Sequence, residues 1–359
     1  MWAVTAQFLQ ALQFPQIRSS IFTYTMPGGT AKVLQVQAGS VGVDWAQRIR
    51  RTCSLTVLGS QADYVAMATP GTVFRVTHGL IMGSTTELVP VFTGEQTAGA
   101  QRMGDGTISL SLADHGNWLA RARFLIPYAP VATTLRTQAI SDIVTSAKPG
   151  TTILNLSSDT GTVGIQNVWT DSRLDAITAL CRDGSADGFF RPDGVFVIQD
   201  LPTPSTASSW TAAGIIESGD RKRPMDKLYN TVVVRPSATD GSQTWTQQVA
   251  QITDTGNPRH PNYIGVVPYF FASPTASTAA VAMGIAQGIL YKVMGTTETL
   301  SLGMISNPAL DGGDVIRVIA PAVGSDPAQI YQHFVDTISL DLNTGSMSLG
   351  TRSQAVAIV

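Results

Sequence analysis

The chain has 359 residues, which is enough for two or three domains that each bury a core of their own. Apolar residues make up 43% of it and charged residues only 13%, roughly half the charged share of an average soluble domain. The formal net charge of −2 excludes the strongly basic face with which a nucleic-acid binder neutralises phosphates. A surface so poor in charge suits a protein that is largely covered by partners.

The N-terminal segment, 1–30, has no basic start, and glutamines interrupt its apolar run, so the sequence predicts no targeting segment. We expect a short amphipathic helix there instead. The apolar side of this helix is formed by Val4, Phe8, Leu9 and Leu12.

Residues 31–126 are expected to form a first small β-barrel. Short runs rich in β-branched and other apolar residues are separated by Gly, Asp, Pro and Ser, which is typical of a small antiparallel barrel or sandwich. The expected strands are 32–37, 54–58, 74–78, 80–82, 86–92 and 107–112.

Residues 127–200 are expected to form an α/β module of two helices and a hairpin. Helical spacing of apolar residues predicts the first helix over 136–147. The second helix is expected to start near Asp171, which can cap it, and to close at Gly184 in the left-handed conformation. Asp193-Gly194 predicts the turn of the hairpin that follows.

The rest of the chain is expected to form a second small β-barrel that a helix interrupts. Its parts are 201–271 for the first half of the barrel, 272–300 for the helical insertion and 301–359 for the second half. Its expected strands are 229–234, 244–252, 315–320, 331–342 and 346–349, and its expected helix is 274–294, ended by Gly295. This helix carries Gln287 and Lys292 and is too short and too polar to span a bilayer, so no membrane span is predicted. The sequence contains no tandem repeat.

Residues that usually carry catalysis or bind metals are few. None of the four histidines has a second histidine or a cysteine at ligand spacing. A run from Asp183 imitates the start of a calcium loop, but Gly194 stands where a bidentate glutamate is required, which favours a helix end and a turn. Asp311-Gly312-Gly313-Asp314 likewise favours a tight turn. Because no nucleophile elbow, zinc motif or phosphate loop is present, we predict no catalytic residue, no metal ligand and no cofactor site.

The two cysteines, Cys53 and Cys181, lie far apart in the sequence. Cys53 falls in a strand-like run and Cys181 on an apolar helical position, so both are interpreted as small buried hydrophobic residues. A single long-range disulfide is the less favoured alternative, because disulfide frameworks usually contain more cysteines.

A series of short motifs runs in a fixed order from about Lys32 to Arg352. The first is Gly39-Ser40-Val41, followed by Asp44 and by Arg50-Arg51 at the start of a strand. The others are Asp105-Gly106-Thr107, Arg121-Ala122-Arg123-Phe124, Thr170-Asp171-Ser172-Arg173, Asp193-Gly194-Val195-Phe196, Leu228-Tyr229-Asn230-Thr231 and Asp311-Gly312-Gly313-Asp314. In order and spacing they resemble the minor tail proteins of actinobacterial phages.

This resemblance implies a baseplate or tail-tip hub with two β-barrel domains and α/β elements inserted between and within them. In related hubs the two barrels of each subunit alternate around a trimer, and the resulting pseudo-six-fold ring adapts a hexameric tail tube to a three-fold tip. The implied partners are two further copies of the chain, the tail tube or distal tail protein, a downstream tip, spike or fibre protein, and the tape-measure protein. No small-molecule substrate is implied, and the implied location is the virion tail tip, assembled in the host cytoplasm. Related tail-tip proteins often continue into an endopeptidase, lysozyme or fibre module, whereas this chain ends at Val359, so we expect other proteins to supply those activities.

Six residues are candidates for contacts between subunits: Asp44, Arg48, Arg50, Arg51, Gly284 and Gly288. The arginines form either a solvated strand edge or ion pairs to an adjacent subunit, for which the planar guanidinium is better suited than lysine. The glycines have a small-xxx-small spacing, which lets a helix approach a neighbouring backbone either within the subunit or across the ring.

Three classes of function fit the sequence to different degrees. The hub is favoured by the resemblance and by the two β-rich regions; the hub of a phage-like contractile injection system is a close variant of it. A receptor- or glycan-binding tail protein would need grouped aromatic residues, yet the tryptophans are spread along the chain. A cell-wall hydrolase is disfavoured because no acid pair or metal cluster is evident.

Overall fold

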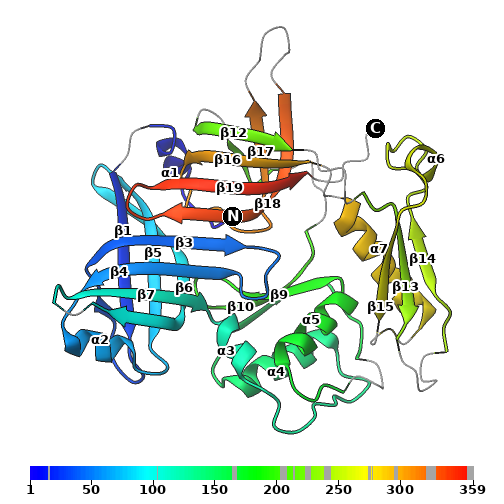
Figure 1. Cartoon of the computed structure of the whole chain (residues 1–359), viewed down its shortest axis with the longest axis horizontal. Helices are drawn as coiled ribbons and strands as arrows, with labels where there is room; N and C mark the ends of the chain where they lie inside the picture. The colour runs from blue at the N-terminus through cyan, green and yellow to red at the C-terminus, as the bar shows by residue number, and fades with distance from the viewer. Residues whose placement is uncertain are drawn as a thin grey trace.

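The computed structural model describes residues 1–14, 17–102, 104–163, 168–202, 208–212, 215–222, 228–237, 244–273, 276, 278–294, 298–320 and 329–353. Most of its regular structure is β-strand, with a few helices, so the expected β-rich α+β class is confirmed. Figure 1 shows a large sheet, with two smaller α/β parts beside it.

The large sheet contains thirteen strands in two groups along the chain. The first group is β1 Ile17–Thr25, β2 Lys32–Val33, β3 Val36–Asp44, β4 Arg51–Leu58, β5 Val73–Met82, β6 Thr85–Gln101 and β7 Thr107–Asp114. The second group is β11 Trp210–Ala212, β12 Ile216–Lys222, β16 Thr299–Ile305, β17 Val315–Ala320, β18 Gln329–Asp341 and β19 Ser346–Ser353. The strand order is β12-β16-β19-β18-β3-β4-β7-β6-β5-β1-β2, and β17 pairs with both β18 and β11. Of these strands, β1, β11, β12, β16 and most of β3 had not been expected from the sequence.

The two halves of this sheet repeat one arrangement. The order β3-β4-β7-β6-β5 matches β12-β16-β19-β18-β17 in succession along the chain, and every neighbouring pair in both sets is antiparallel. Bulges recur at the same places, at the first pairing of β3 and of β12 and in the middle of the pairing of β6 with β7 and of β18 with β19. The sixth strand differs in direction, because β1 is antiparallel to β5 whereas β11 is parallel to β17. The structure therefore contains an internal repeat that the sequence did not reveal.

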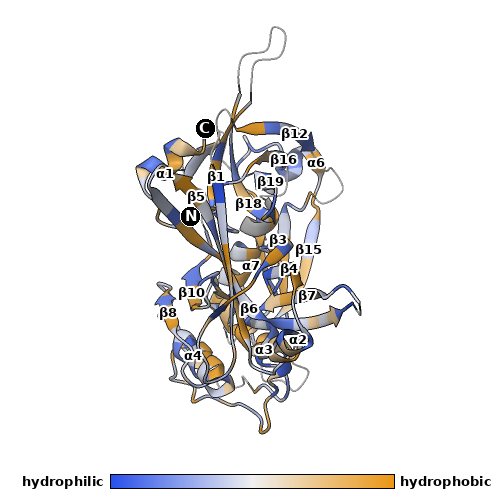
Figure 2. Cartoon of the chain, turned by 90° about the vertical axis from the view of Figure 1, so that its left-hand side faces the viewer, coloured by the Kyte–Doolittle hydropathy of each residue, from blue (hydrophilic) through white to orange (hydrophobic). Residues whose placement is uncertain are grey.

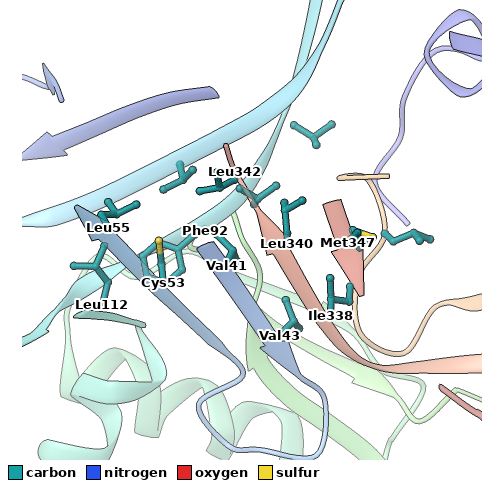
Figure 3. Packing of buried hydrophobic residues seen from close by; sticks show 14 of the residues in the cluster. Val41, Val43, Cys53, Leu55, Phe92, Leu112, Ile338, Leu340, Leu342 and Met347 are labelled. Carbon is teal, nitrogen blue, oxygen red and sulfur yellow. The ribbon is translucent and has the colours of Figure 1, made fainter. Parts of the chain in front are cut away.

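One hydrophobic core fills both halves. Alternate residues of the strands face inward, as in β4, where Cys53, Leu55 and Val57 are buried between exposed or half-buried neighbours. Figure 3 shows these side chains continuing from β4 and β3 to Ile338 and Leu340 of β18 without a break. Truncating one such buried leucine typically costs about 2–5 kcal/mol of stability.

The expectation of two closed small barrels is corrected by this arrangement. Among the described residues neither half closes on itself, and both belong to one continuous sheet with a common core. The reason lies in β18, which pairs with β17 up to Phe334 and, after its bulge, with β3 from Thr337 onward. The strand edge that could have closed the second half is thereby used to bind the first half.

The α/β module contains three helices and a three-stranded sheet in the order β8-β10-β9. Its elements are α3 Gly116–Arg121, α4 Arg136–Ala147, β8 Ile153–Leu156, α5 Arg173–Asp183, β9 Ala186–Phe190 and β10 Phe196–Asp200. Helix α4 has the bounds that its apolar spacing predicts, and the expected turn at Gly194 has a φ of +88°, which glycine tolerates. The module has its own core, which includes Ile140, Ile177 and Phe196.

Two details of α5 differ from the expectation. The N-cap is Ser172, whose hydroxyl accepts a hydrogen bond from the Asp175 amide, and the expected cap Asp171 pairs with Arg123 instead. Gly184 has a φ of −91°, and the left-handed position falls on Ser185, with a φ of 51°. The turn is therefore shifted by one residue.

The insertion between β12 and β16 is a second small α/β part. It contains β13 Thr231–Pro236, β14 Gln248–Gln251, α6 Pro261–Ile264, β15 Pro268–Ser273 and α7 Ala279–Met294. The first two of these strands were expected in the second barrel, but they pair with β15 in a separate sheet of order β14-β13-β15, against which α7 packs. The insertion therefore begins well before the expected 272, while the expected helix boundaries at 274 and 295 lie outside the described residues.

Two short helices lie against the large sheet. α1 Ala6–Ala11 buries Phe8 against Leu80 and Met82 of β5, which confirms the expected N-terminal helix, and Figure 2 shows it beside that strand. α2 Gln61–Met67 follows β4 and precedes β5 along the chain, and it starts with a capping box formed by Ser60 and Asp63.

Candidate assembly interface

The joint between the two halves of the sheet is formed by β18 and β3. Their antiparallel register runs from Thr337 opposite Asp44 to Asp341 opposite Ser40. Backbone hydrogen bonds extend it at both ends, from Trp45 N to Asp336 O at 2.8 Å and from Leu342 N to Gly39 O at 2.9 Å. The joint is thus a normal β-ladder, with Leu340 and Val41 directly opposite each other in the core.

The internal repeat gives this joint a counterpart on the outer edges of the sheet. β12 corresponds to β3, and within the described residues nothing pairs with its outer edge. The last part of β6 corresponds to the part of β18 that pairs with β3, and residues 98–101 pair with β7 on one side only. On the other side the Tyr64 hydroxyl donates a hydrogen bond to the Gly99 carbonyl at 3.3 Å. Each chain therefore has two sheet edges that match the two partners of its internal joint.

One face of the sheet is lined by hydroxyl groups. On the central strands the residues that alternate with the buried ones are almost all Ser, Thr, Gly or Ala, and neighbouring strands bring them side by side, as in the pairs Ser54–Ser111 and Ser339–Ser348. We call this surface the hydroxyl face; its serines and threonines are Ser40, Thr52, Ser54, Thr56, Ser109, Ser111, Ser301, Thr337, Ser339 and Ser348. These residues lie on β16, β19, β18, β3, β4 and β7, which are neighbours in the sheet in that order and are stacked one above the other in Figure 1.

Arg50 and Arg51 are buried, and their partners lie within the chain. The guanidinium of Arg51, 1% exposed, pairs with Asp311 and donates to the Phe190 carbonyl at 2.6 Å, while its amide donates to the Asp114 carboxylate at 2.8 Å. Arg50 pairs with Asp187 and stacks on the Phe189 ring at 3.9 Å. Neither residue lies on a solvated strand edge, because the α/β module covers the start of β4. Their proposed contact with an adjacent subunit is replaced by this internal role.

Asp44 is the last residue of β3, and Arg48 lies in the turn between β3 and β4. Arg48 forms an ion pair with Asp175 of α5, in which both side chains are more than half exposed. The Asp44 carboxylate accepts a hydrogen bond from the Ala46 amide at 2.9 Å and so closes the turn. Both residues remain accessible, and a role for them between subunits stays a prediction.

The turn at Asp311 to Asp314 is the tight turn that the sequence favours. Gly313 has a φ of +88°, and Asp314 accepts a hydrogen bond from the Asp311 amide at 2.7 Å. Burial raises the pKa of Asp314, and the positive charge of the Met1 amino group opposes that shift. The turn joins the N-terminus and, through Arg51, the first half of the sheet to the second half.

A cleft of about 350 Å³ lies between the β3–β4 turn, α5 and β9. Its wall includes Arg48, Arg50 and Arg352, each of which has a carboxylate partner within the chain, Asp175, Asp187 and Asp336 respectively. Burial raises the pKa of Asp336 to about 6, opposed by the charge of Arg352. Because these three cations are already paired, they join the parts of the chain around the cleft. A fourth arginine of the wall, Arg182, stacks on the Phe271 ring at 4.8 Å.

The two glycines of α7 have different surroundings. A methyl group added at Gly284 would meet open space, whereas one at Gly288 would lie 3.6 Å from the Ser185 hydroxyl. The second value is an ordinary contact, so neither glycine is required for close packing within the subunit. The alternative contact across the ring stays a prediction.

Three of the four histidines are buried structural residues. His78, His115 and His333 are buried, and burial lowers the pKa of each to about 4. His78 is hydrogen-bonded to Ser20 at 2.7 Å and His333 to Thr351 at 2.9 Å, on the two halves of the sheet. In the part of the chain that the structure describes, no three His, Cys, Asp or Glu side chains form a group that could hold a metal.

Cys53 and Cys181 are both free and buried, which confirms their interpretation as small hydrophobic residues and excludes the disulfide. Among the described residues, no helix is long and apolar enough to cross a membrane.

The fold is similar to solved phage tail proteins over nearly their whole length. A tail protein from Neisseria meningitidis MC58 is 12% identical with a TM-score of 0.64, and covers 94% of this chain and 98% of its own. The 43 kDa tail protein of prophage MuSo2 from Shewanella oneidensis is 13% identical with a TM-score of 0.63, and covers 93% of this chain and 98% of its own.

A type VI secretion component, the E. coli c3393 protein, is described as structurally similar to the T4 tail proteins gp27 and gp5. It is 10% identical with a TM-score of 0.52, and covers 93% of this chain and 77% of its own. No protein-family model matches the sequence, and no curated protein is recognisably similar to it in sequence. The chain therefore has the fold of phage tail proteins, and the resemblance inferred from its motifs is confirmed at the level of the fold.

Proposed function

We propose that this chain is a structural virion protein, a baseplate or tail-tip hub that assembles as a trimeric ring. The ring joins a hexameric tail tube to a three-fold tail tip, takes part in DNA ejection, and carries out no catalysis itself. The similarity to tail proteins over 93–94% of the chain supports this class of function.

The main observation in support of the proposed ring is the internal repeat. A hexameric tube presents six equivalent contacts, and a chain with two equivalent five-strand units fills two of them, so three chains fill six. The β18–β3 joint supports this arrangement because it connects the two units edge to edge, as neighbours in a ring must be connected.

The hydroxyl face fits the inner wall of such a ring. It consists of small, mostly uncharged side chains, which hold neither a polyanion nor an extended protein by strong charge pairing. A DNA or tape-measure chain could slide along such a surface. The sheet face opposite it is already filled by the common core, so it is not available to line a channel.

The alternative of a glycan-binding tail protein gains no support from the tryptophans. All six lie in the described residues, and each is buried or half-buried, so none contributes to an exposed stacking platform. The close variant, a hub of a phage-like contractile injection system, is supported by the similarity to the type VI component, since the same ring would serve both machines.

The proposal can be tested by mixing the purified chain with a purified tail-tube protein from the same phage or prophage. Negative-stain microscopy should show three-fold rings that cap the ends of tubes. Tubes with bare ends, or decoration along the tube wall, would contradict the role as a hub.

A further inference from the structure

We infer that the free edge of β12 in one chain pairs with the last part of β6 in a second copy, in the register that β3 and β18 use within the chain. This inference rests on the proposed ring and names the strands and the residue pairs that would close it. It follows from the internal repeat, because the two edges that remain open are the counterparts of the two edges that are already joined.

The bulges fix the correspondence residue by residue. The unpaired residue of the bulge is Gln37 in β3 and Glu217 in β12, so Ser40 corresponds to Asp220 and Gly42 to Lys222. The bulge residue of β6 is Thr97 and that of β18 is Asp336. Ser339 and Asp341 of β18 therefore correspond to Ala100 and Arg102.

Transferring the known register gives the pairs between chains. Ser339 lies opposite Gly42, which places Ala100 opposite Lys222. Asp341 lies opposite Ser40, which places Arg102 opposite Asp220. The second pair brings opposite charges together where antiparallel side chains are closest.

The exposure of the two edges agrees with this pairing. In β18 the inward residue Leu340 is buried and the outward Ser339 is exposed, and in β6 the matching Gln101 is half-buried and Ala100 is exposed. The Arg102 amide donates to Thr107 of β7, so the hydrogen-bonding groups that alternate with it face the free edge. The Tyr64 hydroxyl, which now bonds the Gly99 carbonyl, would be displaced by the incoming strand.

The joint between chains would be less apolar than the one within the chain. Gln101 takes the place of Leu340, and Arg221, which is paired with Glu298, takes the place of Val41. A subunit that must be soluble before assembly needs such an edge, because exposed apolar edge strands aggregate. With this joint the eight consecutive strands from β12 to β6 in each of three chains would form one closed barrel with the hydroxyl face inside.

Cysteine cross-linking tests the register. Ala100 and Lys222 would form a non-hydrogen-bonded pair, whose Cα separation of about 4.5 Å suits a disulfide. The double variant Ala100→Cys/Lys222→Cys is oxidised at a concentration where the chain is trimeric and is analysed on a non-reducing gel. The control Ala100→Cys/Asp220→Cys shifts the register by two residues, and the native Cys53 and Cys181 are buried and do not compete.

We expect the first variant to give a ladder of dimer and trimer and the control to remain largely monomeric on the gel. If the chain is a trimer in solution but the first variant does not form the cross-link, or both variants form it equally, the proposed joint is wrong and the ring is unaffected. A chain that stays monomeric both alone and with the tube protein added overturns the joint together with the ring.

Discussion

Arg51 should be the most important single ion-pairing residue of the chain. Its guanidinium is 1% exposed and links β4 to Asp311, 19% exposed, and to the backbone carbonyl of Phe190 in the α/β module. The substitution Arg51→Met keeps the length of the side chain and removes every one of these side-chain bonds. It removes one donor from the half-buried Asp311 carboxylate, which still accepts from the Gly312 amide, and the side-chain donor of the Phe190 carbonyl.

The expected loss of stability follows from this burial. Removing one partner of a buried ion pair costs about 3–5 kcal/mol, because the remaining charge stays desolvated. The matched control is Arg48→Met in the turn just before β4. Its partner Asp175 is 57% exposed, so the loss should be about 0–1 kcal/mol. The double variant Arg51→Met/Asp311→Leu removes both charges and should recover part of the loss.

The assay is urea denaturation followed by tryptophan fluorescence, with the unfolding midpoints and slopes compared between the three variants and the natural chain. Equal midpoints for Arg51→Met and Arg48→Met would refute the reasoning, because they would mean that the buried pair contributes no more than the exposed one. A double variant that is less stable than Arg51→Met would refute the desolvation argument specifically.

Three further predictions concern other parts of the chain. Burial lowers the pKa of His115 to about 4, so the stability that its neutral form contributes is present above pH 6.5 and is lost as the pH falls toward 4. In urea titrations the free energy of unfolding of His115→Phe should therefore rise relative to that of the natural chain by about 1.4 kcal/mol for each pH unit by which the pH falls over that range. A difference that stays constant with pH would contradict this. Gly284→Ala should raise the free energy of unfolding by about 0.5–1 kcal/mol, because alanine favours a helix and the added methyl group meets open space. The substitution should leave the trimer intact, as checked by light scattering. Loss of the trimer would instead place α7 in the interface between subunits. Arg102→Glu should shift the equilibrium from trimer toward monomer in analytical ultracentrifugation. The double variant Arg102→Glu/Asp220→Arg, which exchanges the two charges, should restore the trimer. If it does not, the predicted charge pair is contradicted.

The sequence predicted those elements whose pattern is local. Helix α4 was located to the residue because its apolar spacing is regular, and the strands β4, β5 and β7 were found because Val, Leu and Ile alternate with polar residues. β12 was missed because it is an edge strand of polar and charged residues, Ile216–Lys222, which has no hydrophobic alternation to detect.

The internal repeat and the joint could not be read from the sequence. What the two halves share is strand order, direction and the position of two bulges, and these leave almost no trace in residue identity. The roles of the arginines were missed for a related reason. The partners of Arg50 and Arg51 are Asp187 and Asp311, which lie 137 and 260 residues further along the chain, and no local pattern connects them.

The most direct test of the ring is the absolute mass of the purified protein, measured by light scattering over a range of concentrations and again with the tube protein added. We predict a species of three times the 38.0 kDa chain, with no larger or open-ended assembly of the chain alone. A monomer at every concentration that also remains free of the tube, or a dimer with two-fold symmetry, would contradict the account of this chain as a hub ring.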